Sequence, residues 1–219
     1  MHFEFLVEDG SGAKMLDKLI PKILGGDNDY KIHSYKGCGS LPPKSKSNQP
    51  PEKRALLNQL PRLLNGYGNQ YRNNTKDNVV IVVCDLDKRD KSSFLSELNT
   101  VLQSCQYPPQ VRFCLAIEEG EAWLLGDWNA IKKAYPKAKD KIFSKYQNDS
   151  ICDTWEKLAD VVYSGGSSKL KKQGFAVIGQ TKCEWAENIS QWMDVSNNKS
   201  PSFNYFKSTL EDLSDCQGS

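Results

Sequence analysis

Acidic residues gather where the most apolar segments of the chain end. Asp85 and Asp87, separated by one residue, directly follow the apolar run 79–83. Glu8 follows a shorter apolar run, and Glu121 lies in an acidic group after the run 111–117. Carboxylates held close together repel one another unless a cation lies between them, and Mg²⁺ or Mn²⁺ prefers oxygen ligands. The pattern therefore predicts a site for Mg²⁺ or Mn²⁺.

These acids can meet only if the segments before them form neighbouring parallel strands. Apolar runs predict strands over residues 3–7, 79–83 and 111–117, and a weaker alternation predicts another over residues 30–35. Helical spacing of apolar residues predicts helices over 14–24, 52–67, 90–105 and 119–135. This order indicates an α/β, Rossmann-like fold with a mostly parallel four-stranded sheet flanked by helices. Such sheets bind ligands at the carboxyl ends of their strands.

The alternation of predicted strands and helices ends at residue 136. We expect an α/β domain over residues 1–136 and a helical C-terminal extension, residues 137–219, that packs on it. Helical spacing covers residues 151–162, 183–193 and 202–213, with a loop rich in Gly, Ser and Lys at 164–174. A loop rich in Pro and Ser is expected at 37–51.

Composition narrows the classes of function. The 219 residues include 29 basic and 27 acidic ones, so a basic surface must be local. Seven scattered cysteines without a CxxC pair, and a start that does not resemble a signal peptide, predict a cytoplasmic protein with reduced thiols. The sequence contains no run of eighteen apolar residues, so we expect no helix that spans a membrane. The two histidines, His2 and His33, have no triad-like spacing, which argues against a Ser-His-Asp or Cys-His nucleophile.

Each acidic group also has a plainer interpretation. Strand ends are commonly solvated, and acids near a helix N-terminus stabilise the helix dipole. The turn at Gly10 and Ser11 could hold a phosphate on its backbone amides, or Ser11 could be a simple N-cap. Three acidic groups at one edge of one sheet favour the metal site over the plainer interpretation.

Two segments resemble the Toprim domain of topoisomerases, DnaG-type primases and OLD-family nucleases. They are Leu6-Val7-Glu8, followed by a Gly turn and a helix, and Val82-Val83-Cys84-Asp85-Leu86-Asp87. The hallmark of Toprim domains is a glutamate after the first strand and Asp-x-Asp after the third.

Further short segments resemble a bacterial Toprim-like family that is often encoded beside AAA or ABC-type ATPases. Glu121-Ala122-Trp123-Leu124-Leu125 is the most distinctive of them. The others, which extend the resemblance over nearly the whole chain, are Leu60-Pro61-Arg62-Leu63-Leu64, Ala134-Tyr135-Pro136, Lys182 with Ala186 and Ile189, and Ser200-Pro201-Ser202-Phe203.

The resemblance implies a metal-dependent nuclease. Its acidic positions, which would hold one or two Mg²⁺ or Mn²⁺ ions, correspond to Glu8, Asp85, Asp87 and Glu121, and Lys182 would contact a phosphate or the transition state. The implied reaction is phosphodiester hydrolysis of DNA or RNA, in concert with an ATPase partner in bacterial anti-phage defence. The chain departs from the Toprim pattern at position 9, where Asp9 stands in place of glycine.

Basic residues near the acids are candidates for contact with nucleic acid. Lys88 and Arg89 follow the Asp-x-Asp, and Lys169 and Lys172 lie in the Gly/Ser/Lys-rich loop. Either pair could follow a phosphate backbone, and either could simply be solvated.

Two other functions stay open from the sequence alone. The chain could be a non-catalytic Toprim-like module that docks on an ATPase and regulates it. It could also be a receiver-like or phosphatase-like domain that uses Asp85 as a phosphoryl acceptor. The receiver-like version lacks a recognisable lysine after a fifth strand, and the phosphatase-like version expects Asp-x-Asp after the first strand.

Overall fold

Four parallel strands form one sheet in the order β2-β1-β3-β4. The computed structural model describes residues 1–26, 28–41, 55–151 and 153–215. The strands are β1 (His2–Val7), β2 (Asp29–Ser34), β3 (Asn78–Asp85) and β4 (Val111–Ala116). The central strand β3 is buried on both faces, as its unbroken apolar run predicts. The predicted α/β fold with a four-stranded parallel sheet is confirmed.

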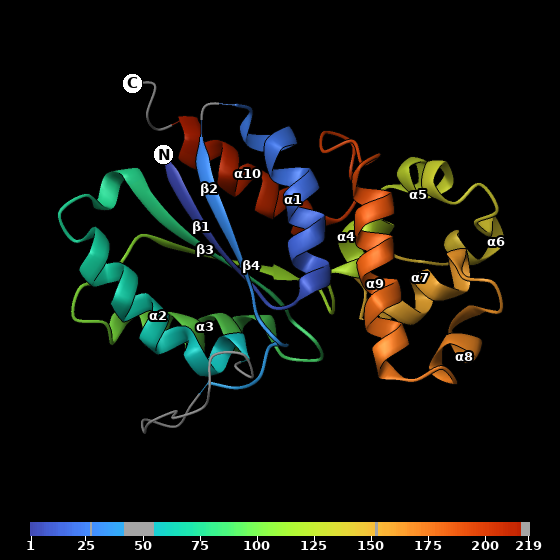
Figure 1. Cartoon of the computed structure of the whole chain (residues 1–219), viewed down its shortest axis with the longest axis horizontal. Helices are drawn as coiled ribbons and strands as arrows, with labels where there is room; N and C mark the ends of the chain where they lie inside the picture. Colours follow the sequence, from blue (N-terminus) through green and yellow to red (C-terminus); the bar gives the residue numbers. More distant parts are fainter. Residues whose placement is uncertain (27, 42–54, 152, 216–219) are drawn as a thin grey trace.

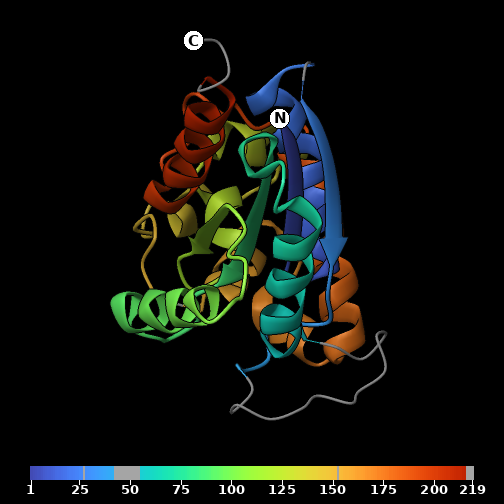
Figure 2. The same ribbon diagram turned by 90° about the vertical axis from the view of Figure 1, so that its left-hand side faces the viewer.

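Helices cover both faces of this sheet, so the molecule has three layers (Figures 1 and 2). One face packs against α2 (Leu56–Tyr71) and α3 (Lys91–Gln103). The other packs against α1 (Gly10–Leu24) and α10 (Pro201–Asp215), and α9 (Phe175–Ser190) packs against α1. Alternate residues of β1 enter the two layers, with Phe3 and Phe5 in one and Leu6 in the other.

The C-terminal helices contribute directly to the core of the sheet. Phe203 and Phe206 of α10 are fully buried in the same cluster as Phe3 and Phe5 of β1. Their rings contact those of neighbouring layers, with Phe206 centred 6.3 Å from Phe5. The domain boundary at residue 136 stays a prediction, but residues on both sides of it form this cluster.

Several predictions for the chain after β4 are wrong in detail, and the helix predicted over 183–193 is α9, which begins eight residues earlier. The single helix expected over residues 119–135 is two, α4 (Glu121–Leu125) and α5 (Trp128–Ala134). Asp127 separates them, because its carboxylate caps α5 by accepting a hydrogen bond from the Ala130 amide at 3.0 Å. The loop expected over 164–174 contains the short helix α8 (Gly166–Lys171), which the buried side chain of Leu170 anchors.

The remaining helices are α6 (Asp140–Phe143), α7 (Thr154–Val162) and the 3₁₀ turn η2 (Thr75–Asp77). Helix α2 continues through Pro61 and ends four residues later than predicted, while part of its expected start, residues 52–54, lies outside the described residues. Most of the Pro-rich loop expected at 37–51 also lies outside them. None of the helices in the described ranges has the length and apolar character needed to cross a membrane.

Candidate functional site

The ends of β1 and β3 bring Glu8 and Asp85 together. The register pairs Val7 with Val83, so the two strands end side by side. The Glu8 amide continues the ladder by donating to the Val83 carbonyl at 3.1 Å. The Asp85 amide then donates to Oε2 of Glu8 at 2.9 Å. The expectation that the first and third strands are neighbours is therefore confirmed.

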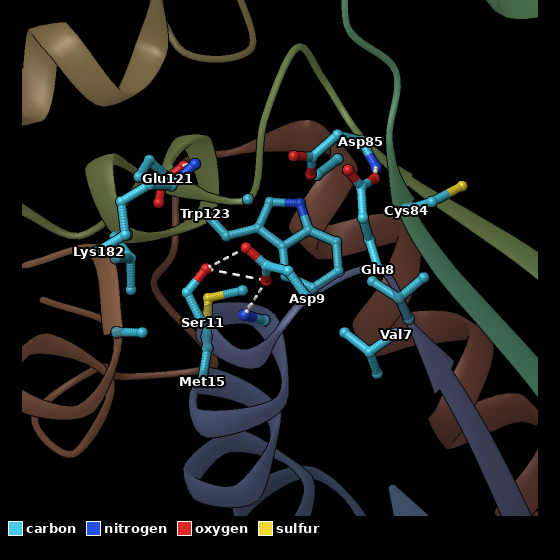
Figure 3. A pocket seen from close by; sticks show the side chains of 16 residues that line it. Val7, Glu8, Asp9, Ser11, Met15, Cys84, Asp85, Glu121, Trp123 and Lys182 are labelled. Carbon is cyan, nitrogen blue, oxygen red and sulfur yellow. Dashed lines mark hydrogen bonds and ion pairs between the residues drawn. The ribbon is translucent and has the colours of Figure 1, made fainter. Parts of the chain in front are cut away.

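A small cavity lies against this pair of acids (Figure 3). Its volume is about 30 Å³, which suits a single ion or water molecule. Its polar lining comes from Glu8, Asp9, Ser11, Asp85, Glu121 and Lys182. Its apolar lining includes side chains of the core cluster on the α1 side of the sheet: Val7, Met15, Val83, Trp123, Leu124 and Ala186.

Asp9 holds the first turn of α1 against the cavity. Its carboxylate accepts hydrogen bonds from the Gly12 amide at 2.7 Å and from the Ser11 hydroxyl at 2.7 and 2.9 Å. A Cβ on Gly12 would lie 2.8 Å from Cγ1 of Val7, so a larger residue there would force Val7 to move. The alternative that Ser11 caps this helix is wrong, because Asp9 is the N-cap. Gly10 is exposed in the first turn.

Buried Glu121 and half-buried Lys182 form an ion pair on the opposite side of the cavity. Glu121 is the first residue of α4, and Lys182 comes from the middle of α9. Nζ of Lys182 lies 3.1 Å from Oε2 of Glu121 and 3.8 Å from Oε1 of Glu119. Burial disfavours the ammonium, but attraction to Glu121, Glu119, Asp85 and Asp9 outweighs it and raises the pKa of Lys182. Lys182 is therefore charged throughout the physiological pH range.

Three acids that line the cavity, Glu8, Asp85 and Glu121, have raised pKa values. Burial and the nearby charge of Glu8 raise the pKa of Asp85 well above its usual range. Burial, Asp87 and Asp9 raise the pKa of Glu8, although the hydrogen bond from the Asp85 amide opposes them. Burial also raises the pKa of Glu121 despite the attraction of Lys182. The ionised forms of these three acids are therefore disfavoured in the free protein, and a cation placed between them would favour ionisation.

Asp87 is close to this site but does not line the cavity. Its backbone is left-handed, with φ of 53°, and its side chain is 51% exposed. Its carboxylate lies 3.4 Å from Nη2 of Arg89. Arg89 also donates to Sγ of Cys38 at 3.4 Å, so the guanidinium is held by the protein itself. Lys88 is exposed beside them.

The structure separates the predicted basic residues into two places. Lys182 lies at the cavity, whereas Lys169, in α8, and Lys172, its C-cap, lie exposed on the surface. Of the predicted metal ligands, Glu8, Asp85 and Glu121 share the cavity lining and Asp87 stands outside it.

Two further acids at this edge have roles that the sequence did not reveal. The carboxylate of Glu118 accepts hydrogen bonds from the Thr154 amide at 2.8 Å and from the Thr154 hydroxyl. The carboxylate of Glu119 accepts one from the Trp155 amide at 3.0 Å. Both therefore fix the N-terminus of α7, and burial raises the pKa of Glu119 to about 7. No short-range signal links residues 118–119 to 154–155, because the contact depends on the tertiary fold.

The donor set fits a hard divalent cation by its chemistry. Oxygen ligands from Glu8, Asp85 and Glu121 are those that Mg²⁺ and Mn²⁺ prefer, and the cavity volume suits an ion. Within the described ranges, no three Asp, Glu, His or Cys side chains are already arranged as ligands. Since Glu121 pairs with Lys182, binding of an ion requires side chains to turn toward it.

A comparison with protein families identifies one match, which covers residues 7–211 and therefore every residue of the cavity. The chain belongs to the family described as Domain of unknown function (DUF4276). No curated protein and no solved structure matches the chain.

Proposed function

We propose that this DUF4276 protein is a nuclease that requires Mg²⁺ or Mn²⁺ and hydrolyses phosphodiester bonds of DNA or RNA. One observation carries the proposal: Glu8, Asp85 and Glu121, from three separate places in the chain, line one ion-sized cavity beside a half-buried lysine. Acids in such surroundings are unfavourable without a cation, and strand ends of a parallel sheet are the usual place for a ligand.

Glu8, Asp85 and Glu121 would hold the cation, with Asp87 joining them if its side chain turned inward. When bound, the cation would polarise the scissile phosphate and lower the pKa of a coordinated water. The hydrogen bond from the Asp85 amide to Oε2 of Glu8 would orient this carboxylate for binding the cation.

Lys182 would stabilise the negative charge of the reacting phosphate. Its ammonium is charged and buried at the cavity, where a fixed positive charge acts more strongly than in water. Its present partner, Glu121, would be the carboxylate that a cation recruits, which would release the ammonium toward the phosphate.

The size of the cavity favours a substrate that stays largely outside it. Pockets that enclose a small organic ligand usually measure about 300–1,000 Å³. The cavity of about 30 Å³ is far smaller. A phosphate group of a polymer, presented at the sheet edge, fits this geometry better than an enclosed nucleotide.

A non-catalytic module that docks on an AAA or ABC-type ATPase is the second candidate. It is favoured by the internal partners of the acids, since Asp9, Glu118, Glu119 and Glu121 are all bound by groups of the protein. The region at the carboxyl ends of the strands can therefore be stable without a bound cation and serve as a docking surface. In either case we propose action in the bacterial cytoplasm beside an ATPase, in anti-phage defence.

The test is cleavage of supercoiled plasmid and of structured RNA with Mg²⁺ or Mn²⁺. Wild type should cleave one of them, and Asp85→Ala and Glu8→Ala should each lower the rate at least about a hundredfold, as loss of metal-site groups does. Glu97→Ala, an exposed acid on α3, is the matched control and should cleave normally. A folded wild-type protein without activity, both alone and with its ATPase, would favour the docking module.

A further inference from the structure

Phe175 is the most exposed of the large apolar side chains in the described ranges. It is 92% exposed at the first position of α9, whereas Tyr205 is 52% and Trp192 45% exposed. An aromatic ring costs free energy when it stands fully in water, because its apolar area is large. The ring packs little against the rest of the protein, and a ligand that covered it would remove this cost.

The chain around Phe175 is basic. Residues 161–183 contain four lysines and no acidic residue. Lys171 is paired with Glu156 at 3.0 Å, and Lys182 belongs to the cavity. Lys169 and Lys172 are exposed, and neither has an ion-pair partner among the described residues. Two positive charges without an ion-pair partner in the described ranges therefore lie three and six residues before the exposed ring.

This segment is held in a defined shape. Leu170, within α8, is fully buried, and Lys169 and Lys172 near it are exposed. The carboxylate of Asp160 accepts a hydrogen bond from the Ser167 amide at 2.7 Å at the start of α8. Gly174, with φ of 88°, turns the chain directly into α9. Phe175 and the two lysines are thus presented from an ordered tip, which we call the α8–α9 tip (Lys169, Lys172 and Phe175).

The tip is aligned with the cavity along α9. Phe175 and Lys182 are seven residues apart, which places them on one face of the helix about 10 Å from each other along its axis. Gly179 lies between them on this face, and a Cβ there would meet nothing within 4 Å. The face from the exposed ring to the cavity is therefore open.

We propose that the α8–α9 tip binds a single-stranded segment of nucleic acid, with an unpaired base stacked on Phe175 and the neighbouring phosphates beside Lys169 and Lys172. This inference rests on the proposed nuclease function and adds its substrate class. An aromatic ring stacks on the face of any base, and lysines neutralise phosphates without regard to sequence. A base in a duplex has both faces covered by its neighbours, so the ring selects an unpaired one.

The experiment is binding of short fluorescent oligonucleotides, measured by anisotropy in EDTA so that no cleavage occurs. Wild type should bind single-stranded DNA or RNA more tightly than the matching duplex. Phe175→Ala should weaken that binding about five- to a hundredfold, and Phe175→Trp should restore it. The double variant Lys169→Gln/Lys172→Gln should weaken binding and make it less sensitive to salt. Tyr205→Ala, which removes an exposed aromatic ring from α10, should bind like wild type.

Three results would overturn the inference. They are unchanged single-strand binding by Phe175→Ala, preference for the duplex, and a change in oligomeric state with Phe175→Ala that identifies the ring as a contact between copies. The Asp85→Ala protein separates the two proposals. Single-strand binding by this variant without cleavage supports both, whereas cleavage by wild type that does not depend on Phe175 contradicts only the tip.

Discussion

Glu4 and Glu8 belong to the same segment of chain, yet their surroundings are opposite. Glu4, buried within β1, is surrounded by hydrogen-bond donors. His2 lies 2.9 Å and His33 2.6 Å from its two oxygens, and the Tyr71 hydroxyl donates at 3.0 Å. Burial raises the pKa of Glu4, but the hydrogen bonds from His2, His33 and Tyr71 together outweigh it and lower that pKa.

Glu8, directly after β1, has acids as its main neighbours. The Asp85 amide supplies one hydrogen bond, whereas the charges of Asp87 and Asp9 add to the effect of burial and raise its pKa. The pKa values of Glu4 and Glu8 therefore shift in opposite directions because different groups pack against the two carboxylates.

The charge of Glu4 stabilises the fold, whereas the charges of Glu8 and Asp85 are suited to binding a ligand. The Glu4 cluster is satisfied by the protein itself, so it stabilises the fold with no ligand. The Glu8 and Asp85 pair is unfavourable in the free protein, and such groups are kept where a ligand uses them. Unfolding measurements in EDTA on variants of Glu4 and of Asp85 can distinguish an acid that stabilises the fold from one that destabilises the metal-free protein.

The largest change in stability is expected from Glu4→Gln. The substitution keeps the volume but removes the charge that His2, His33 and Tyr71 bind, and hydrogen bonds to a charged group contribute about 1.5–3 kcal/mol. We expect the free energy of unfolding to fall by about 1–3 kcal/mol in urea titrations. Cleavage per folded molecule should stay at the wild-type rate.

The pH dependence of the same variant is the control. Because the pKa of Glu4 is lower in the folded state than its ordinary value of 4.5, its contribution is present above about pH 4.5. That contribution is lost as the pH falls through the folded pKa. Wild type should therefore lose its advantage over Glu4→Gln in acid, and an unchanged difference between them would contradict the role given to Glu4.

The opposite sign is expected from Asp85→Asn. The amide removes one of two repelling carboxylates and can donate to Glu8, so the metal-free protein should gain about 0.5–1.5 kcal/mol of stability. Metal-dependent cleavage should be lost in the same protein. A variant that is less stable than wild type would show instead that the Asp85 carboxylate is structural.

The sequence predicts the strands that carry the acids of the site better than it predicts the hydrogen bonds around them. The strands were predictable because β3 is a continuous apolar run, and Glu8 and Asp85 then meet by topology alone. The break between α4 and α5 was missed because it depends on Asp127, whose carboxylate caps α5 and also accepts a hydrogen bond from the distant Asp194 amide at 2.8 Å.

The Glu4 cluster was also missed, although a signal was present. A glutamate inside an apolar strand requires partners, and the only two histidines of the chain, His2 and His33, lie on strands that pair with each other. The links from residues 118–119 to α7 had no such signal, because they join segments that only the folded chain brings together.

The smallest change is expected from Asp87→Asn, which tests the Asp-x-Asp pattern itself. The side chain is half exposed and paired with Arg89, so the free energy of unfolding should change by less than about 0.5 kcal/mol. Because Asp87 does not line the cavity, cleavage should fall less than it does for Asp85→Asn, when both are assayed at saturating Mn²⁺. An equal loss of cleavage would show that Asp87 turns inward to bind the ion, as the Toprim resemblance implies. Either rate, set beside the unfolding data, tells whether the second aspartate is a ligand or only a neighbour whose charge raises the pKa of Glu8.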